Sequence, residues 1–299
     1  MRRSKNAGAA IMLGLWALFL LSALVISWAM DINSRIAVSS EGTRMLKAEA
    51  VACSGAEVAL APTTKPGSAN LNGQLNGGAT YKAQLTGEGG RIDLNWVFAR
   101  PETVELLRRY LENKGIDLNE RDLMIDSLRD WVSPNVGVHG LNAPPERDDY
   151  HPAHAPLSRV DELKNVAGWA EFTSVPGWDE DFTVNTKTGI DLSWASRDVL
   201  LALPDMTPDL VDRFLQVRDG PDGIPGTEDD TPITIQDIPS MLGIPPQRFA
   251  QLQLFLAPSI PVPVFRVTSV GNAGKATRTV QMVFRRAGVV PQVITWKEF

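Results

Sequence analysis

The sequence is poor in the residues that build many reactive sites, with one cysteine, Cys53, and three histidines among 299 residues. A single cysteine excludes an intrachain disulfide and any cysteine-rich zinc or iron–sulfur site. There is neither a G-x-S-x-G nucleophile motif nor a credible Cys–His pair, and Cys53 lies among small residues, where we expect it to pack inertly. We therefore expect no enzymatic activity.

The chain also has fewer basic than acidic residues. The chain has 29 Lys and Arg residues against 35 Asp and Glu residues, which gives a formal net charge of −6. A protein that wraps nucleic acid needs a cationic surface. The composition therefore argues against nucleic acid as a partner.

The three histidines, His139, His151 and His154, fall in one stretch of the chain. Zinc would need further ligands, which carboxylates of this stretch could supply. However, there is no H-E-x-x-H motif, and Pro152 would break a helix that aligned His151 with His154. We interpret all three as surface-loop histidines.

Charge is absent from the segment Ala9–Met30, which has no Asp, Glu, Lys or Arg in 22 residues. As a helix it would be about 33 Å long, enough to cross the hydrocarbon core of a bilayer. Arg2, Arg3 and Lys5 precede it, so the positive-inside rule places the N-terminus in the cytoplasm and the rest of the chain in the periplasm. The apolar run is too long for an ordinary cleaved signal peptide. We expect a single-pass protein of the inner membrane.

Helical periodicity continues past the apolar segment, through residues 31–61. Gly42 is the one obvious weak point before Pro62. A single helix that reached residue 61 would be about 80 Å long.

A short basic leader that ends in glycine, followed by such a helix, resembles the N-terminus of type IV pilins and of type II secretion pseudopilins. The resemblance implies that a prepilin peptidase cleaves after Gly8 and that the new amine of Ala9 is methylated. Most members carry Glu at the fifth mature position, which here is Leu13. Since an unpaired carboxylate in an apolar helix bundle is costly, Leu13 fits a subunit that begins or caps a fibre and has no neighbour above it.

The rest of the chain predicts a mixed fold. After Pro62 comes a Gly-, Ser-, Thr- and Asn-rich stretch, then alternating strand patterns, then a long block of helical patterns, and finally strand patterns again. We expect an α+β fold with a long N-terminal transmembrane pilin helix, a small antiparallel pilin-like sheet and a large inserted all-helical domain. The expected parts are a leader (1–8), a transmembrane helix (9–30), its periplasmic continuation (31–61), an αβ head (62–95 and 258–299) and the inserted domain (96–257).

One motif occurs twice, as RIDLNW at 91–96 and GIDLSW at 189–194. We interpret its Ile and Leu as core residues and its Asp and Asn as turn or cap residues. Together with LRDWVSPN, SRVDELKNV and VITW, the order of segments resembles the general secretion pathway protein K family, the large minor pseudopilins of type II secretion, over nearly the whole chain.

The segment RDGPDGIPGTEDD is the densest cluster of oxygen ligands in the sequence. Ca²⁺ takes about six to eight oxygens, and glycines let the chain wrap around it. The spacing is not that of an EF-hand, and an acidic solvated loop is the alternative. K-type pseudopilins are known to bind calcium in their helical domain, so the resemblance favours a structural Ca²⁺. The expected ligands are Asp219, Asp222, the carbonyl of Ile224, Glu228, Asp229 and Asp230.

A second acidic cluster contains Asp130, Glu146, Asp148 and Asp149. The family is richer in Asp just after the DW pair, whereas here residues 132–134 are Val, Ser and Pro. A second metal site is therefore left open.

The segment DVLLALPDMTPDLVDRF resembles a helix-hairpin-helix, an element that offers backbone N–H groups to a DNA phosphate. Here Asp205 stands at the glycine position, and Asp209 and Asp212 follow. A phosphate would meet carboxylates instead of amide donors. We interpret the hairpin as packing architecture.

These observations predict a non-catalytic minor pseudopilin that forms or caps the tip of the periplasmic pseudopilus, which helps drive folded exoproteins through the outer-membrane secretin. The resemblance implies as partners the I- and J-type minor pseudopilins, the major pseudopilin, prepilin peptidase and the inner-membrane secretion platform. A type IV pilus minor pilin and, less favoured, a membrane-anchored DNA-uptake protein are the alternatives.

Overall fold

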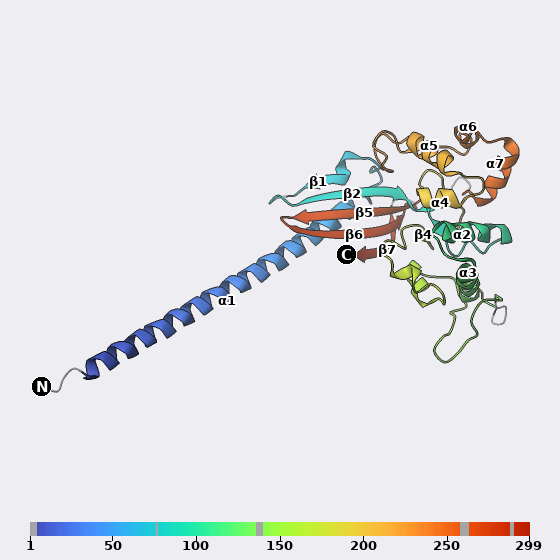
Figure 1. Ribbon diagram of the computed structural model, residues 1–299. Helices are drawn as coiled ribbons and strands as arrows, with labels where there is room; N and C mark the ends of the chain where they lie inside the picture. The colour runs from blue at the N-terminus through green and yellow to red at the C-terminus, as the bar shows by residue number, and fades with distance from the viewer. Residues whose placement is uncertain (1–4, 76, 136–139, 258–262, 288–289) are drawn as a thin grey trace.

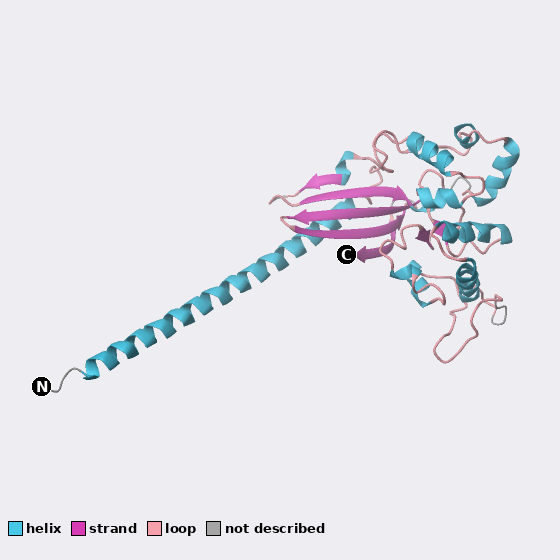
Figure 2. Cartoon of the chain, viewed as in Figure 1, coloured by secondary structure: helices cyan, strands magenta, loops and turns pink. Residues whose placement is uncertain are grey.

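The molecule consists of a long helix, a five-stranded sheet and a helix-rich region (Figure 1). A computed structural model describes residues 5–75, 77–135, 140–257, 263–287 and 290–299. The helix leaves from one end of the sheet, and the helix-rich region lies beyond the other end (Figure 2). The predicted α+β class, with a long N-terminal helix and a small antiparallel sheet, is confirmed.

Helix α1 (Lys5–Val58) is one unbroken helix of 54 residues, so it is about 81 Å long. Gly42 does not interrupt it, and an added Cβ there would meet nothing within 4 Å. The N-terminal part is long and apolar enough to cross a membrane, and none of its most apolar window is buried within the protein. The helix ends four residues before Pro62, which has no N–H to continue it.

The C-terminal part of α1 lies very close to the sheet, because small residues line the contact. Ala48, Ala52 and Ala56 are fully buried. On the opposite side, a Cβ added to Gly271 would lie 2.1 Å from the carbonyl oxygen of Ala48. Glycine is therefore required here by the approach of the helix backbone.

The main sheet is antiparallel, with the strand order β1-β2-β5-β6-β7. Leu85, Val267 and Met282 are aligned by the registers across the three inner strands, and all three are fully buried. They form part of the core between the sheet and α1. The strands are β1 (Asn72–Gln74), β2 (Thr80–Gly87), β5 (Val264–Ala273), β6 (Ala276–Arg285) and β7 (Gln292–Glu298).

The helix-rich region, inserted between β2 and β5, is built on a second core that includes Leu107, Tyr110, Trp169 and Phe182. It also contains one short parallel strand pair, so it is not entirely helical. Its elements are β3 (Ile92–Asp93), α2 (Pro101–Asn113), α3 (Leu118–Val132), β4 (Phe182–Thr183), α4 (Arg197–Ala202), α5 (Pro208–Arg218), α6 (Ile238–Leu242) and α7 (Pro246–Leu252). Short 3-10 helices lie at Ala69–Leu71, Glu88–Gly90, Val160–Asn165, Phe172–Ser174 and Gln253–Phe255.

The two copies of the repeated motif have equivalent local structures. Ile92 pairs in parallel with Phe182, and Ile190 forms a parallel bridge with Leu256. In the first copy the Asp93 carboxylate accepts the N–H groups of Asn95 and Trp96. In the second, Asp191 accepts the N–H of Ser193 at 3.0 Å. The aspartates therefore stabilise the turn that follows each short strand, as the sequence predicted.

A buried ion pair joins the sheet to the helix-rich region. Glu88 has no exposed surface, and its carboxylate accepts two hydrogen bonds of 2.8 Å from Arg266 on β5. It also accepts hydrogen bonds from Arg91, at 3.2 Å, and from the hydroxyl of Thr183 on β4, at 2.7 Å. Burial by itself would raise the pKa of Glu88, but the charges of Arg266 and Arg91 outweigh it and hold the pKa below its ordinary value.

Trp194 packs directly on the glycines that flank Glu88. A Cβ added to Gly87 would lie 2.3 Å from Trp194 Cδ1, and one added to Gly90 would lie 2.2 Å from the Trp194 backbone. The second copy of the motif thus packs against residues 87–90 (GEGG), where a side chain at Gly87 or Gly90 would clash with Trp194.

Candidate functional site

The sequence predicts functional residues in two places: helix α1, called the stalk below, and the acidic loop, residues 218–230. It also drew attention to the histidine loop, residues 139–154, and to the α4–α5 hairpin, for which it favours a surface loop and a packing role. Gly8 and Ala9, the predicted processing residues, lie within α1. Leu13 is one turn further along, and 72% of its surface is exposed. The apolar residues around it are equally exposed, from Ile11 at 65% to Leu15 at 64%. An apolar surface of this extent is suited to lipid or to neighbouring apolar helices rather than to water.

The acidic loop follows α5 and divides the predicted calcium ligands into two sets. Asp219 is buried and turned toward its neighbour Arg218, with hydrogen bonds of 2.6 and 3.1 Å. Arg218 also donates to the carbonyls of Leu192 and Ala195, so this pair belongs to the core. Glu228 is exposed.

The remaining predicted ligands converge on one hydroxyl, that of Thr227. Its Oγ1 lies 2.7 Å from a carboxylate oxygen of Asp229, 3.1 Å from the carbonyl of Ile224, 3.3 Å from Asp230 and 3.4 Å from Asp222. A hydroxyl has a single proton to donate. At most one of these four acceptors can therefore receive its hydrogen bond.

Two of the carboxyl groups around Thr227, those of Asp229 and Asp230, have pKa values shifted from their ordinary values. Hydrogen bonds from Thr227 and from the N–H of Asp222 lower the pKa of Asp229. Burial raises the pKa of Asp230. In the part of the chain that the structure describes, no group of three or more His, Cys, Asp or Glu side chains is already arranged to hold a metal ion.

The second acidic cluster is dispersed. Asp130 is fully buried on α3, whereas Asp148 and Asp149 are exposed. Glu146 instead contacts histidines, with His154 Nε2 at 3.0 Å and His151 Nδ1 at 3.7 Å. His139 lies outside the described residues.

The turn of the α4–α5 hairpin has one residue in the backbone conformation that glycine adopts most readily. Asp205, at the position where that motif has glycine, has a φ of +61°, in the left-handed region. Asp212 is paired with Arg197 at 2.8 Å, so this charge of the hairpin is neutralised within the protein. Asp205 and Asp209 are both exposed, and their negative charge would repel a phosphate. This geometry supports a packing role for the hairpin.

Replacing Asp205 with glycine is expected to stabilise the protein by about 0.5–1 kcal/mol, because glycine adopts the left-handed conformation without a Cβ penalty. Asp209→Gly is the matched control. It lies in the first turn of α5, where glycine is expected to destabilise by up to about 1 kcal/mol. Urea unfolding measures both. A loss of stability in Asp205→Gly would show that the carboxylate itself stabilises the hairpin.

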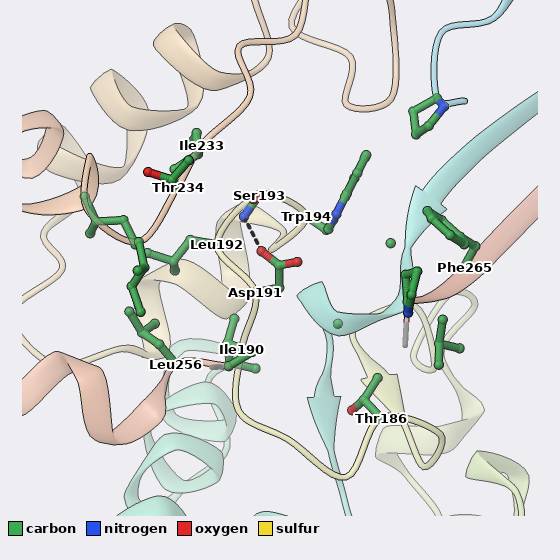
Figure 3. Close-up of a pocket in the computed structure, with 18 of the residues that line it drawn as sticks. Thr186, Ile190, Asp191, Leu192, Ser193, Trp194, Ile233, Thr234, Leu256 and Phe265 are labelled. Atoms are coloured by element: carbon green, nitrogen blue, oxygen red, sulfur yellow. Dashed lines mark hydrogen bonds between the residues drawn. The ribbon is translucent and has the colours of Figure 1, made fainter. Parts of the chain in front are cut away.

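Two features have no clear signal in the sequence. One is the Glu88–Arg266 pair, whose members are 178 residues apart. The other is a cleft of about 670 Å³ between the end of the sheet and the helix-rich region (Figure 3). Only the repeat of the IDL motif, which places Asp191 in the cleft wall, pointed toward this region.

No family model and no curated protein matches the sequence. Among solved structures, the fold is similar to a chain in the crystal structure of the GspK-GspI-GspJ complex from the type 2 secretion system of enterotoxigenic Escherichia coli. The TM-score is 0.59 at 16% sequence identity, and the match covers 89% of this chain and 99% of that one. This chain therefore shares its fold, over most of its length, with a chain of that complex.

Proposed function

We propose that this chain is a K-type minor pseudopilin of a type II secretion system. The shared fold over nearly the whole of both chains is the observation that carries the proposal. The charge-free stalk with Leu13 at the fifth mature position and the large insertion between β2 and β5 support it further.

In this role the protein is mechanical and not catalytic. Helix α1 anchors the chain in the inner membrane with a single span, its N-terminus in the cytoplasm and the rest in the periplasm. After prepilin peptidase removes residues 1–8, the stalk packs beside those of the I- and J-type minor pseudopilins. This complex starts or caps the tip of the pseudopilus that extends from the inner-membrane platform as the major pseudopilin is added, and that pushes folded exoproteins through the secretin.

Mass spectrometry of the mature protein, purified with its membrane, tests this function. The expected N-terminus is a methylated Ala9, and the I- and J-type subunits are expected to co-purify with it. An intact Met1, or a cut near residue 29, would rule out the pseudopilin assignment. Association with a uniform fibre along its whole length would contradict the tip position.

We also propose that the acidic loop holds a structural Ca²⁺. The donor set supports this, because carboxylates and a carbonyl are the oxygens that Ca²⁺ prefers, and they face a hydroxyl that can satisfy only one of them. Asp222, Asp229, Asp230 and the Ile224 carbonyl would be the ligands, once the carboxylates turn inward. Asp219 would remain with Arg218.

Removal of Ca²⁺ is therefore expected to destabilise the protein. An ion at about 100 times its Kd contributes about 2.7 kcal/mol, which in a domain of this size shifts Tm by about 5–10 °C. The measurement is a thermal melt with Ca²⁺ and with a chelator. The shift is expected to disappear in Asp229→Asn and to persist in Asp209→Asn, an exposed acid outside the loop. A wild-type Tm that is the same in both conditions would exclude a structural ion.

A further inference from the structure

The outer edge of strand β7 has unpaired backbone groups. β7 is the last strand of the sheet, at the edge opposite β1 (Figure 1). Phe299, just after it, exchanges two backbone hydrogen bonds with Thr279 of β6, at 2.9 and 3.2 Å. Because inward and outward residues alternate along an antiparallel strand, Trp296 and Glu298 direct their backbone N–H and C=O groups away from β6. In the part of the chain that the structure describes, no other segment binds these groups.

Strand β7 also lacks the features that usually protect a sheet edge, which are a very short strand, a proline or an outward lysine. It has seven residues and no proline. Its one lysine is turned to the helix-rich region, where Lys297 Nζ lies 2.9 Å from Asp161 and 3.2 Å from Asp179. Trp296 and Val293 leave 39% and 45% of their surfaces exposed. An edge of this kind is suited to pairing with another strand.

Three carboxylates lie beside this edge. Glu49, Cys53 and Glu57 are spaced four residues apart on α1, so they project from the same side of the helix. Glu298 is opposite Val280, which packs in the core between the sheet and α1, so Glu298 is on the face that α1 covers. Burial raises the pKa of the Cys53 thiol, and the next causes are the charges of Glu298, Glu49 and Glu57. All three carboxylates are therefore close to Cys53, and we call them the edge carboxylates.

The chain does not neutralise the edge carboxylates. Among the described residues none of them is paired with a Lys, Arg or His side chain, and Glu298 accepts a hydrogen bond only from Trp296 Nε1, at 2.7 Å. Arg278, on β6, has its guanidinium 3.7 Å from Met45 Sδ instead. The residues outside the description include no Lys or Arg after residue 4, and their longest stretch there, 258–262, has two prolines in five residues. By residue type these segments suit neither a counter-charge nor strand pairing.

We propose that the free edge of β7 pairs with an extended, basic segment of a partner protein. The backbone of the segment would add a strand to the sheet, and its Lys or Arg side chains would meet the edge carboxylates. Their methylene stems would pack on Trp296, whose ring also attracts a cation. A second copy of the chain is a poor occupant, because two paired β7 edges would bring two sets of carboxylates together. This pairing does not depend on the secretion role proposed above.

The test uses the full-length protein in a non-ionic detergent and a fluorescent peptide, KVKVKVK, with an amidated C-terminus. When extended, this peptide is basic on one face and apolar on the other. We expect saturable binding by fluorescence anisotropy, with a Kd of about 1 mM or below for so short a segment. The triple variant Glu49→Gln, Glu57→Gln, Glu298→Gln is expected to weaken binding by about tenfold or more.

Two controls separate this contact from non-specific attraction. The triple variant Asp148→Asn, Asp209→Asn, Glu228→Gln removes the same charge from exposed positions elsewhere, and it is expected to bind like the wild type. The second control methylates the backbone nitrogens of either the Lys or the Val residues of the peptide. Because alternate N–H groups of an extended chain point to opposite sides, one of these two peptides is expected to lose binding and the other to keep it.

The proposal would be overturned by absence of binding at millimolar peptide, or by equal binding of the two triple variants with an unchanged Tm. Binding that survives methylation of either set of nitrogens would also overturn it, because the peptide would then not pair as a strand. A disulfide-linked dimer of the Cys53→Ser, Trp296→Cys variant in the absence of peptide would place a second copy on the edge and would contradict the proposal as well.

Discussion

Glu88→Gln is expected to lower the free energy of unfolding by about 3–5 kcal/mol, because it removes one partner of a buried ion pair and leaves the other charge unpaired. Arg266 is 8% exposed and makes both of its 2.8 Å bonds to this carboxylate. Arg91 would also lose its partner, and its pKa is already lowered to about 10, chiefly by burial and next by the charge of Arg266. The amide of glutamine would point an N–H group at these donors. Urea unfolding followed by tryptophan fluorescence measures the loss.

Glu57→Gln is the matched control, since Glu57 is exposed on α1, and it is expected to change the stability by less than about 0.5 kcal/mol. Equal stabilities of the two variants would contradict a stabilising role for the pair. Replacing Glu88 and Arg266 together with Leu and Met is expected to cost much less than the sum of the single changes, because no charge is then left buried alone.

The Glu88–Arg266 pair also makes the stability of the folded protein depend on pH. The pKa of Glu88 in the folded protein is below its ordinary value of 4.5. The contribution of ionised Glu88 to the free energy of unfolding is therefore fully present above pH 4.5. It is lost as the pH falls below 4.5 and through the lowered pKa that Glu88 has in the folded protein. The wild type is expected to lose stability steeply in this acidic range, and Glu88→Gln is expected to lose less there. Parallel pH profiles of the two proteins would assign the acid sensitivity to other carboxylates.

The elements that sequence reasoning predicted well are those whose pattern is local. The charge-free run and its helical continuation predicted α1 to within three residues of its end, since the helix stops at Val58. Period-two alternation near the C-terminus predicted the strands β5, β6 and β7. The segment SRVDELKNV, which belongs to the block of helical patterns, forms a 3-10 helix, Val160–Asn165, because the stretch is too short to develop regular α-helical bonding.

The candidate functional regions were predicted less well, because their structure depends more on contacts between residues that are far apart in the sequence. Glu88 and Arg266 are far apart in sequence and meet only through the pairing of β2 with β5. In the acidic loop, sequence reasoning grouped Asp219 with the other carboxylates, but the adjacent Arg218 binds it. A neighbouring cation was visible in the sequence, yet whether the arginine would turn toward Asp219 or toward solvent depended on the carbonyls of Leu192 and Ala195, which no local pattern reveals.

If the chain acts as proposed, Gly8→Val is expected to abolish both its maturation and exoprotein secretion. A glycine lets an extended backbone approach a protease closely, whereas the branched Cβ of valine blocks that approach. The uncleaved chain keeps Arg2, Arg3 and Lys5 ahead of its apolar helix. Each cation costs about 2.5–3.5 kcal/mol to bring to the centre of a bilayer, so the three together would oppose lifting the subunit out of the membrane by about 8–10 kcal/mol.

Gly14→Val, in the same helix, is the control for cleavage, because a Cβ added there meets nothing within 4 Å. Intact mass spectrometry is expected to show residues 1–8 retained in Gly8→Val and removed in Gly14→Val. Exoproteins in the culture medium, measured with and without each variant, then give the functional result. A Gly8→Val chain that is still trimmed to Ala9 would contradict the cleavage site. A chain that keeps its leader and still supports secretion would mean that the stalk need not leave the bilayer, because the cost of moving its three cations would then not limit the process.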